Sequence, residues 1–100
     1  MRLIARKSLL EIGMAHPNAR SSLHYLIGLV EAAHWQSLAD VVAQVSKAKQ
    51  VTGDRFRFEV AGGQFLVIMA FNWSCGIAFV NFVGTHAAYD KIDAATVSQF

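Results

Sequence analysis

Residues 65–83 read FLVIMAFNWSCGIAFVNFV, and this stretch decides the fold. It lies inside a longer segment, Val60–Tyr89, that contains no Asp, Glu, Lys or Arg. A membrane span needs about 20 predominantly apolar residues, but polar residues and glycines interrupt this segment. Its two apolar runs, Phe65–Asn72 and Ile77–Val83, each have the length of a strand, and Ser74-Cys75-Gly76 joins them. We therefore predict a hairpin of two strands, of which at least one is buried on both faces.

A third strand precedes the hairpin. Polar and apolar residues alternate along Arg55–Val60, which is typical of a half-buried strand, and Gly62-Gly63 forms the turn that follows. Arg2–Ala5 reads as a short first strand. The order is one strand, two or three helices and then an antiparallel meander of three strands. This order predicts an α+β fold in which the helices pack on one face of a small antiparallel sheet.

The helices are expected between the first strand and the meander. Ser8 and Glu11 have the spacing of a capping box, and the helix that they open should end before Pro17, because the residue before a proline disfavours helical geometry. A longer helix is expected at Ala19–Ala33, where apolar residues recur at helical spacing. Ser37, followed by an aspartate three residues later, predicts the cap of a short third helix.

The composition indicates one globular domain, residues 1–100, that is unusually apolar. Hydrophobic residues make up 54% of the chain and charged residues 16%, against a usual charged share of about 25%. Such an excess of apolar residues usually leaves exposed apolar surface that a binding partner covers. The net charge of +2 permits binding to nucleic acid without requiring it. The single cysteine, Cys75, cannot form a disulfide within the chain, and residues 1–7 lack the apolar run of a signal peptide, so we expect a cytoplasmic protein.

Four titratable side chains stand together where the uncharged segment ends: His86, Tyr89, Asp90 and Lys91. Metal-independent cleavage of RNA needs a base for the ribose 2′-hydroxyl, an acid for the leaving oxygen and a cation for the phosphate. A histidine serves as acid or base near neutral pH, a tyrosine donates a proton or stacks on a base, and a lysine holds a phosphate. Asp90 could orient His86 or Lys91. The alternative is a structural role, in which His86 caps a strand end, Tyr89 packs on the core, and Asp90 and Lys91 are solvated.

Basic residues form two further candidate sites for RNA. Arg55 and Arg57 are two residues apart on the predicted strand, so their side chains point to the same face, which suits contacts to phosphates. Glu59 lies on that face too and could pair with Arg57. Lys47 and Lys49 are candidates for contacts to the RNA backbone. For both sets the alternative is a solvated, solubilising surface.

No metal or cofactor site is expected. The four histidines, His16, His24, His34 and His86, show no ligand spacing, and one cysteine cannot make a thiolate site. Gly62-Gly63 lacks the Lys-Ser/Thr pattern that follows a phosphate-binding loop, and it precedes a predicted strand rather than a helix.

The chain resembles the HigB toxins over nearly its whole length. Met1–Leu9 looks like the family's first strand and helix start, and His16-Pro17 stands where the family ends its first helix. Gly62-Gly63 occupies the family's turn. The most specific part is FVGTH, residues 82–86, followed by YDKID, residues 89–93.

This resemblance implies a fold related to the RelE and ParE toxins. It implies a metal-independent endonuclease that cleaves mRNA, often on the ribosome, and that needs no cofactor. It also implies a cognate antitoxin, HigA, that holds the toxin inactive. In such an enzyme His86, Tyr89 and Lys91 would carry the chemistry, and Arg55 and Arg57 would bind phosphate.

The sequence departs from this family at three positions. Similar members usually carry arginines at the positions of Leu66 and Asn81, and often a lysine at that of Gln64. Counting across a two-residue loop predicts Ile68 opposite Asn81, so that Leu66 and Asn81 would be diagonal neighbours, where two arginines would clamp a phosphate. Because both residues are neutral here, the alternative is a toxin-like binding module that binds an antitoxin or RNA with weakened or no cleavage.

Overall fold

The computed structural model describes all 100 residues, and a single five-stranded sheet organises them. In chain order the elements are β1 (Arg2–Ile4), α1 (Arg6–Ala15), α2 (Pro17–Ala32), α3 (Leu38–Gln44), β2 (Lys49–Thr52), β3 (Arg55–Val60), β4 (Phe65–Asn72), β5 (Ile77–Thr85) and α4 (His86–Tyr89). The strand order is β1-β5-β4-β3-β2, with β1 parallel to β5 and the other pairs antiparallel. The α+β class and the meander β3-β4-β5 are confirmed, and β1 and β2 extend the meander to a mixed sheet.

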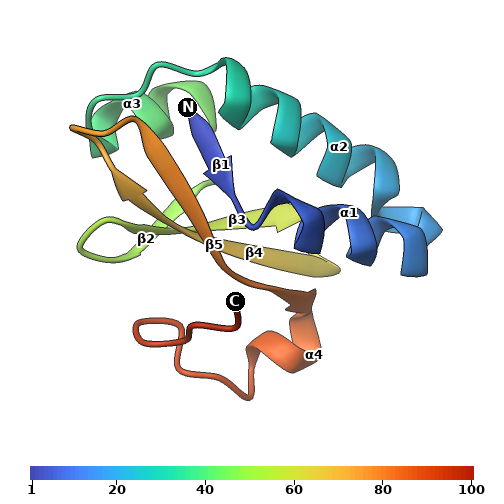
Figure 1. Ribbon diagram of the computed structural model, residues 1–100. Coiled ribbons are helices and arrows are strands. Elements are labelled where there is room, and N and C mark those ends of the chain that lie inside the picture. The colour runs from blue at the N-terminus through green and yellow to red at the C-terminus, as the bar shows by residue number, and fades with distance from the viewer.

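The sheet divides the molecule into two unequal layers (Figure 1). α1, α2 and α3 lie on one face, whereas α4 and the segment after it lie on the other. The prediction that the helices pack on one face thus holds for the three that precede the meander. None of the four helices combines the length and the apolar character needed to cross a bilayer.

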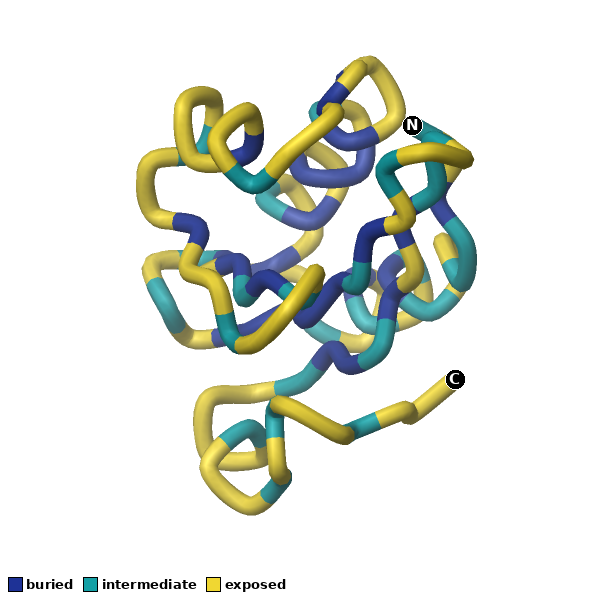
Figure 2. Tube along the Cα trace, turned by 90° about the vertical axis from the view of Figure 1, so that its left-hand side faces the viewer, coloured by how far each residue is buried: buried dark blue, intermediate teal, exposed yellow.

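The main core lies between the sheet and helices α1 to α3. Alternate strand residues such as Phe58, Val67 and Val80 meet Leu23 and Val30 from α2 there, and all five are at most 3% exposed. Full burial of one such side chain stabilises the fold by about 1.5–3 kcal/mol relative to exposure. Figure 2 shows the buried stretches gathered in this layer, while the trace of α4 and the last residues is mostly exposed. The helix layer therefore supplies most of the stability.

The first two helices begin earlier than their sequence patterns predict. α1 begins directly after Ala5, whose φ of 67° is left-handed, and no side chain caps it. The predicted capping box of Ser8 and Glu11 is therefore wrong. α2 begins at Pro17, two residues before the predicted start, because a proline at the first helical position lacks only an N–H that would be unpaired in any case.

A bulge in β5 shifts the register away from the one that counting predicts. Pairing starts as expected at the hairpin loop, but Ile68 lies opposite Phe82 rather than Asn81. Asn81 is an extra residue that the register skips, as in a β-bulge. Leu66 consequently pairs with Gly84. The prediction that Leu66 and Asn81 are diagonal neighbours is therefore wrong.

The second face of the sheet is apolar at its centre and carries charges beside it. Leu66, Ile68 and Phe82 are at most 3% exposed, although none of them belongs to the helix-side core. Arg57 pairs with Ile68, and Ile68 pairs with Phe82, so the three form one row across β3, β4 and β5. α4 and the residues that follow it cover this row (Figure 1).

The segment after α4 has no regular structure and is held by Arg55. The guanidinium Nη1 of Arg55 donates hydrogen bonds to the carbonyl oxygens of Ala94, at 3.2 Å, and Val97, at 2.7 Å. Charged hydrogen bonds of this kind are stronger than neutral ones. Arg55 therefore fastens the segment to the second face.

Gln99 attaches the same segment to the edge of β5. Its N–H donates to the carbonyl oxygen of Asn81 at 2.8 Å, and its Oε1 accepts from the N–H of Val83 at 3.1 Å. The pairing of β1 with β5 ends at Phe79, so this part of β5 has no neighbouring strand on that side. Gln99 satisfies backbone groups that would otherwise face solvent.

Candidate functional site

α4 is a single helical turn that begins where β5 ends. The Oγ1 of Thr85 accepts from the N–H of Ala88 at 3.1 Å, which caps the turn. The N–H of His86 donates to the carbonyl oxygen of Gln64 at 3.0 Å, and Asn18 donates through Nδ2 to the Oε1 of Gln64 at 2.9 Å. The start of α2 and the turn before β4 thus fix where α4 begins. The predicted cluster lies on a helical turn rather than on a strand end.

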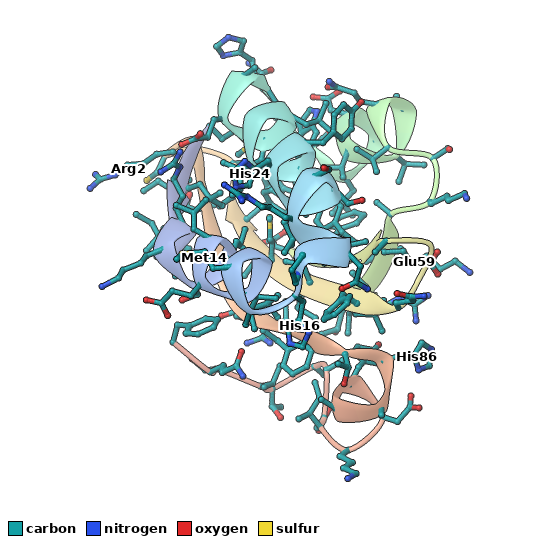
Figure 3. The ribbon with its side chains drawn as sticks, turned by 90° about the vertical axis from the view of Figure 1, so that its right-hand side faces the viewer. Arg2, Met14, His16, His24, Glu59 and His86 are labelled. Atoms are coloured by element: carbon teal, nitrogen blue, oxygen red, sulfur yellow. The ribbon has the colours of Figure 1, made fainter.

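His86 and Asp90 pair across this turn. The Nδ1 of His86 lies 3.2 Å from the Oδ2 of Asp90, and the two side chains are 60% and 61% exposed. Figure 3 shows His86 at the surface, on α4. A carboxylate beside Nδ1 favours the tautomer that carries its proton there. Nε2 is then left with a lone pair that is able to accept a proton from a ligand.

Tyr89 connects α4 with the cationic side of the sheet. Its ring centroid lies 5.7 Å from the guanidinium carbon of Arg57, a distance at which a cation and a ring face attract. Phe82 approaches the same ring edge-on at 6.2 Å, and the His86 ring lies 6.3 Å away. Residues from β3 and α4 are thereby brought to one place on the surface.

Arg57 faces a second cation and has no acidic partner. Lys49 of β2 lies directly opposite it in the sheet, and like charges in that position destabilise a strand pair. Neither residue forms an ion pair, so the possible pairing of Arg57 with Glu59 is not made. The Nε of Arg57 is buried without a hydrogen-bond partner. This corner of the molecule therefore holds uncompensated positive charge.

A hollow of about 290 Å³ opens at this corner. Lys49, Gln50 and Val51 of β2 line one side of it, and Arg57 and Tyr89 complete the wall. None of the five residues is acidic. The hollow therefore suits an anionic ligand that has a flat, partly apolar portion.

The remaining candidate residues lie outside this hollow. Arg55 uses its guanidinium on the carbonyl oxygens of Ala94 and Val97, as described above. Lys47 is exposed in the turn before β2, and Lys91 is exposed just after α4. The structure thus brings together His86, Tyr89, Asp90, Arg57 and Lys49, and it shows no side-chain hydrogen bond or ion pair between these residues and Arg55, Lys47 or Lys91.

Gly84 contributes to the site, although it is not among the site residues predicted from the sequence. A Cβ on Gly84 would lie 2.9 Å from the Cζ of Phe82 and 3.5 Å from the Cβ of Ala88 in α4. Real Cβ atoms essentially never approach other atoms within 3.0 Å. The missing side chain therefore leaves room for the ring of Phe82, whereas the distance to Ala88 is that of an ordinary van der Waals contact. The sequence signal is a glycine one residue before a threonine cap.

Metal-ligating side chains are scattered. No group of three or more His, Cys, Asp and Glu side chains is close enough together to hold a metal ion.

Known proteins were compared with the chain by family and by sequence. The family described as HigB_toxin, RelE-like toxic component of a toxin-antitoxin system, matches residues 19–92. That range contains every element from α3 to α4 and nearly all of α2. No curated protein matches the chain. Because the match covers well over half of the chain and includes the whole candidate site, the protein belongs to the HigB family of RelE-like toxins, the toxic components of toxin–antitoxin systems.

Proposed function

We propose that this toxin is a metal-independent endoribonuclease that cleaves mRNA in the cytoplasm, in association with the ribosome, and so inhibits translation. The RelE-like toxin family is typically a ribonuclease. One observation carries the proposal: the His86–Asp90 pair, Tyr89 and Arg57 lie together although they come from α4 and β3. They supply a base, an acid and a cation, which are the groups that RNA cleavage needs.

The proposed reaction uses each of these side chains once. The Nε2 of His86 takes the proton of the ribose 2′-hydroxyl, the 2′-oxygen attacks the phosphorus, and the bond to the 5′-oxygen breaks. Tyr89 gives its hydroxyl proton to the leaving 5′-oxygen, and the proton on His86 returns to Tyr89 through solvent. Asp90 orients the imidazole through Nδ1. Arg57, with Lys91 and Lys49 nearby in the bound complex, stabilises the charge on the phosphate.

A toxin of this kind has an antitoxin partner, and we propose a HigA-like protein in that role. Several large apolar side chains are exposed, among them Met14 at 77% and Tyr25 at 72%. A partner that covers such side chains would account for the apolar composition of the chain. Arg55 and Lys47 are proposed as outlying contacts to the RNA backbone or to the antitoxin.

The test is induced expression with measurement of growth and of mRNA length. Wild-type toxin should arrest growth and shorten mRNA, and His86→Ala or Tyr89→Phe should restore growth, because a single acid or base contributes about 10²–10⁴-fold to the rate. His24→Ala is the matched control, since His24 is an exposed histidine on α2, in the layer opposite α4 (Figure 3). Intact mRNA after wild-type expression would refute the endonuclease.

A binding module is the second candidate, and the positions of Leu66 and Asn81 favour it. Leu66 is uncharged and only 1% exposed, so RNA finds no cation at this position. Asn81 lies at the bulge with a buried Nδ2 that has no partner. The cationic surface is therefore reduced to few residues. A wild-type protein that binds an antitoxin or RNA but leaves mRNA intact would establish this candidate.

A further inference from the structure

We infer that a groove between α2 and the turn that joins β3 to β4 is a docking surface for one segment of the antitoxin. That segment carries an apolar side chain beside a lysine or arginine. The inference rests on the proposed function, because it takes the antitoxin as the partner, and it adds the surface that anchors this partner. No residue that lines the groove belongs to α4 or lines the hollow beside Tyr89.

The groove has the size and the lining of a binding cleft. Its volume is about 420 Å³, and ligand-binding clefts have volumes of about 300–1,000 Å³. Tyr25 and Leu29 of α2 are four residues apart, so their side chains lie one above the other on the same face of the helix. Val45, Val60 and Ala61 add further apolar surface. Tyr25 is 72% exposed, and exposed tyrosines are among the side chains that contribute most to binding in protein interfaces.

The charge of the groove selects a protein segment rather than RNA. Glu59 is the only charged residue that lines it, and this exposed carboxylate forms no ion pair. Figure 3 shows Glu59 at the surface of the molecule. A carboxylate repels the phosphates of RNA and attracts a lysine or arginine, and complementary charges of this kind fix the partner and its register. The apolar lining beside Glu59 suits an apolar side chain next to that base.

Ala61 lines the groove in a strained backbone conformation. Its φ of 55° is left-handed, the φ of Gly62 is 67°, and the N–H of Gly63 donates to the carbonyl oxygen of Val60 at 3.2 Å. Turns with two left-handed central residues favour asparagine or glycine, and glycine adopts this conformation without strain. Backbone strain of this kind clusters at ligand-binding sites. The methyl group of Ala61 supplies apolar surface to the groove that a glycine would not.

The test measures binding of the toxin to the antitoxin encoded beside its gene by titration calorimetry. All variants carry His86→Ala, which removes the proposed base, so that growth arrest does not limit production, and which lies outside the groove. Tyr25→Ala should weaken binding by about 30-fold, as expected for a tyrosine that anchors an interface. His24→Ala is the matched control, since His24 is the neighbouring exposed residue of α2 and does not line the groove.

Ala61→Gly provides a second test, in which stability and binding should change in opposite directions. Relief of the left-handed strain should raise the urea midpoint of unfolding. Loss of one methyl group from the interface should weaken antitoxin binding by about fourfold. If Ala61 had a structural role alone, the variant would bind as tightly as the parent.

Glu59→Gln tests the charge of the groove. At low salt the variant should bind the antitoxin about 1.5- to 5-fold more weakly, and the difference should shrink at high salt, because exposed ion pairs are screened. Glu11→Gln, at an exposed glutamate of α1, should leave the affinity unchanged.

The outcomes separate this inference from the proposed function. Equal affinity of the parent and of folded Tyr25→Ala and Ala61→Gly would overturn the docking surface, and so would an antitoxin that does not bind the parent, even if wild type shortens mRNA. A dimer of the toxin alone, or a complex with RNA, that Tyr25→Ala abolishes would assign the groove to that other occupant and overturn the inference. Antitoxin binding that depends on Tyr25, with mRNA intact after wild-type expression, would support the docking surface and refute the endonuclease.

Discussion

The two faces of the sheet differ in how they are covered. Three helices cover one face, and their contacts with it are continuous and apolar. The other face has only a small buried row, Leu66, Ile68 and Phe82, under one helical turn and an irregular segment that a few hydrogen bonds hold. The candidate site lies entirely on this second face. The comparison indicates that the helix layer supplies the stability while the second face keeps charges and ring atoms accessible.

The division has a physical basis. Uncompensated cations such as Lys49 and Arg57 lower stability, so a chain keeps them only where other contacts offset the cost. Like-charge pairs and exposed rings are tolerated on the second face because the packing of the helix layer already stabilises the fold. Each of the following predictions tests whether stability and site chemistry can be altered separately.

The largest expected effect comes from the helix layer. Phe58→Ala removes a ring that is 1% exposed in the main core, and it should lower the free energy of unfolding by about 3–5 kcal/mol. Urea denaturation measures the change. Tyr25→Ala, at a side chain that is 72% exposed, should change the free energy by no more than about 0.5 kcal/mol. A loss under about 1 kcal/mol for Phe58→Ala would mean that the helix layer does not supply most of the free energy of unfolding.

An intermediate effect is expected where Arg55 holds the segment after α4. Arg55→Gln removes the charged hydrogen bonds to Ala94 and Val97, and hydrogen bonds to charged groups contribute about 1.5–3 kcal/mol. The loss should be local, so limited proteolysis should cut residues 93–100 faster while urea unfolding of the helix layer changes little. Arg20→Gln, at an exposed arginine of α2, is the matched control. Unchanged cleavage would contradict the role of Arg55.

The smallest effect is expected at the like-charge pair. Lys49→Glu places an opposite charge across from Arg57 and should raise the free energy of unfolding by about 0.2–1 kcal/mol. The same change should weaken RNA binding, because a carboxylate in place of the Lys49 ammonium repels phosphate. Lys47→Glu, which lies in the preceding turn and faces no cation in the sheet register, should give no stabilisation. If both variants are stabilised, the cause would be the lower net charge of the protein and not the removal of the Lys49–Arg57 repulsion.

The strands of the meander could be predicted because their signals are local. Phe65–Asn72 is a continuous apolar run with turn residues on both sides, and β4 has these same bounds. β2 could not be predicted, since its sequence, Lys49–Thr52, is short and largely polar and becomes a strand only by pairing with β3. The start of α1 was missed because the left-handed backbone of Ala5 replaces a side-chain cap.

The candidate site could be predicted in part. His86, Tyr89 and Asp90 are close in sequence, and any local structure would keep them close. The contact between Tyr89 and Arg57 depends on the register of three strands and on the bulge at Asn81, which residue counting does not reveal. The use of Arg55 to hold the distant carbonyl oxygens of Ala94 and Val97 is likewise a long-range contact without a local signal.

The bonds that Gln99 makes also bear on how the protein behaves at high concentration. Beyond Phe79, β5 would present bare N–H and C=O groups to any extended chain, and such open edges promote intermolecular strand pairing. By occupying Asn81 and Val83, Gln99 blocks that template for aggregation. We therefore expect the protein to resist strand-to-strand aggregation in part through Gln99, which uses its backbone N–H and its side-chain oxygen at the margin of the sheet.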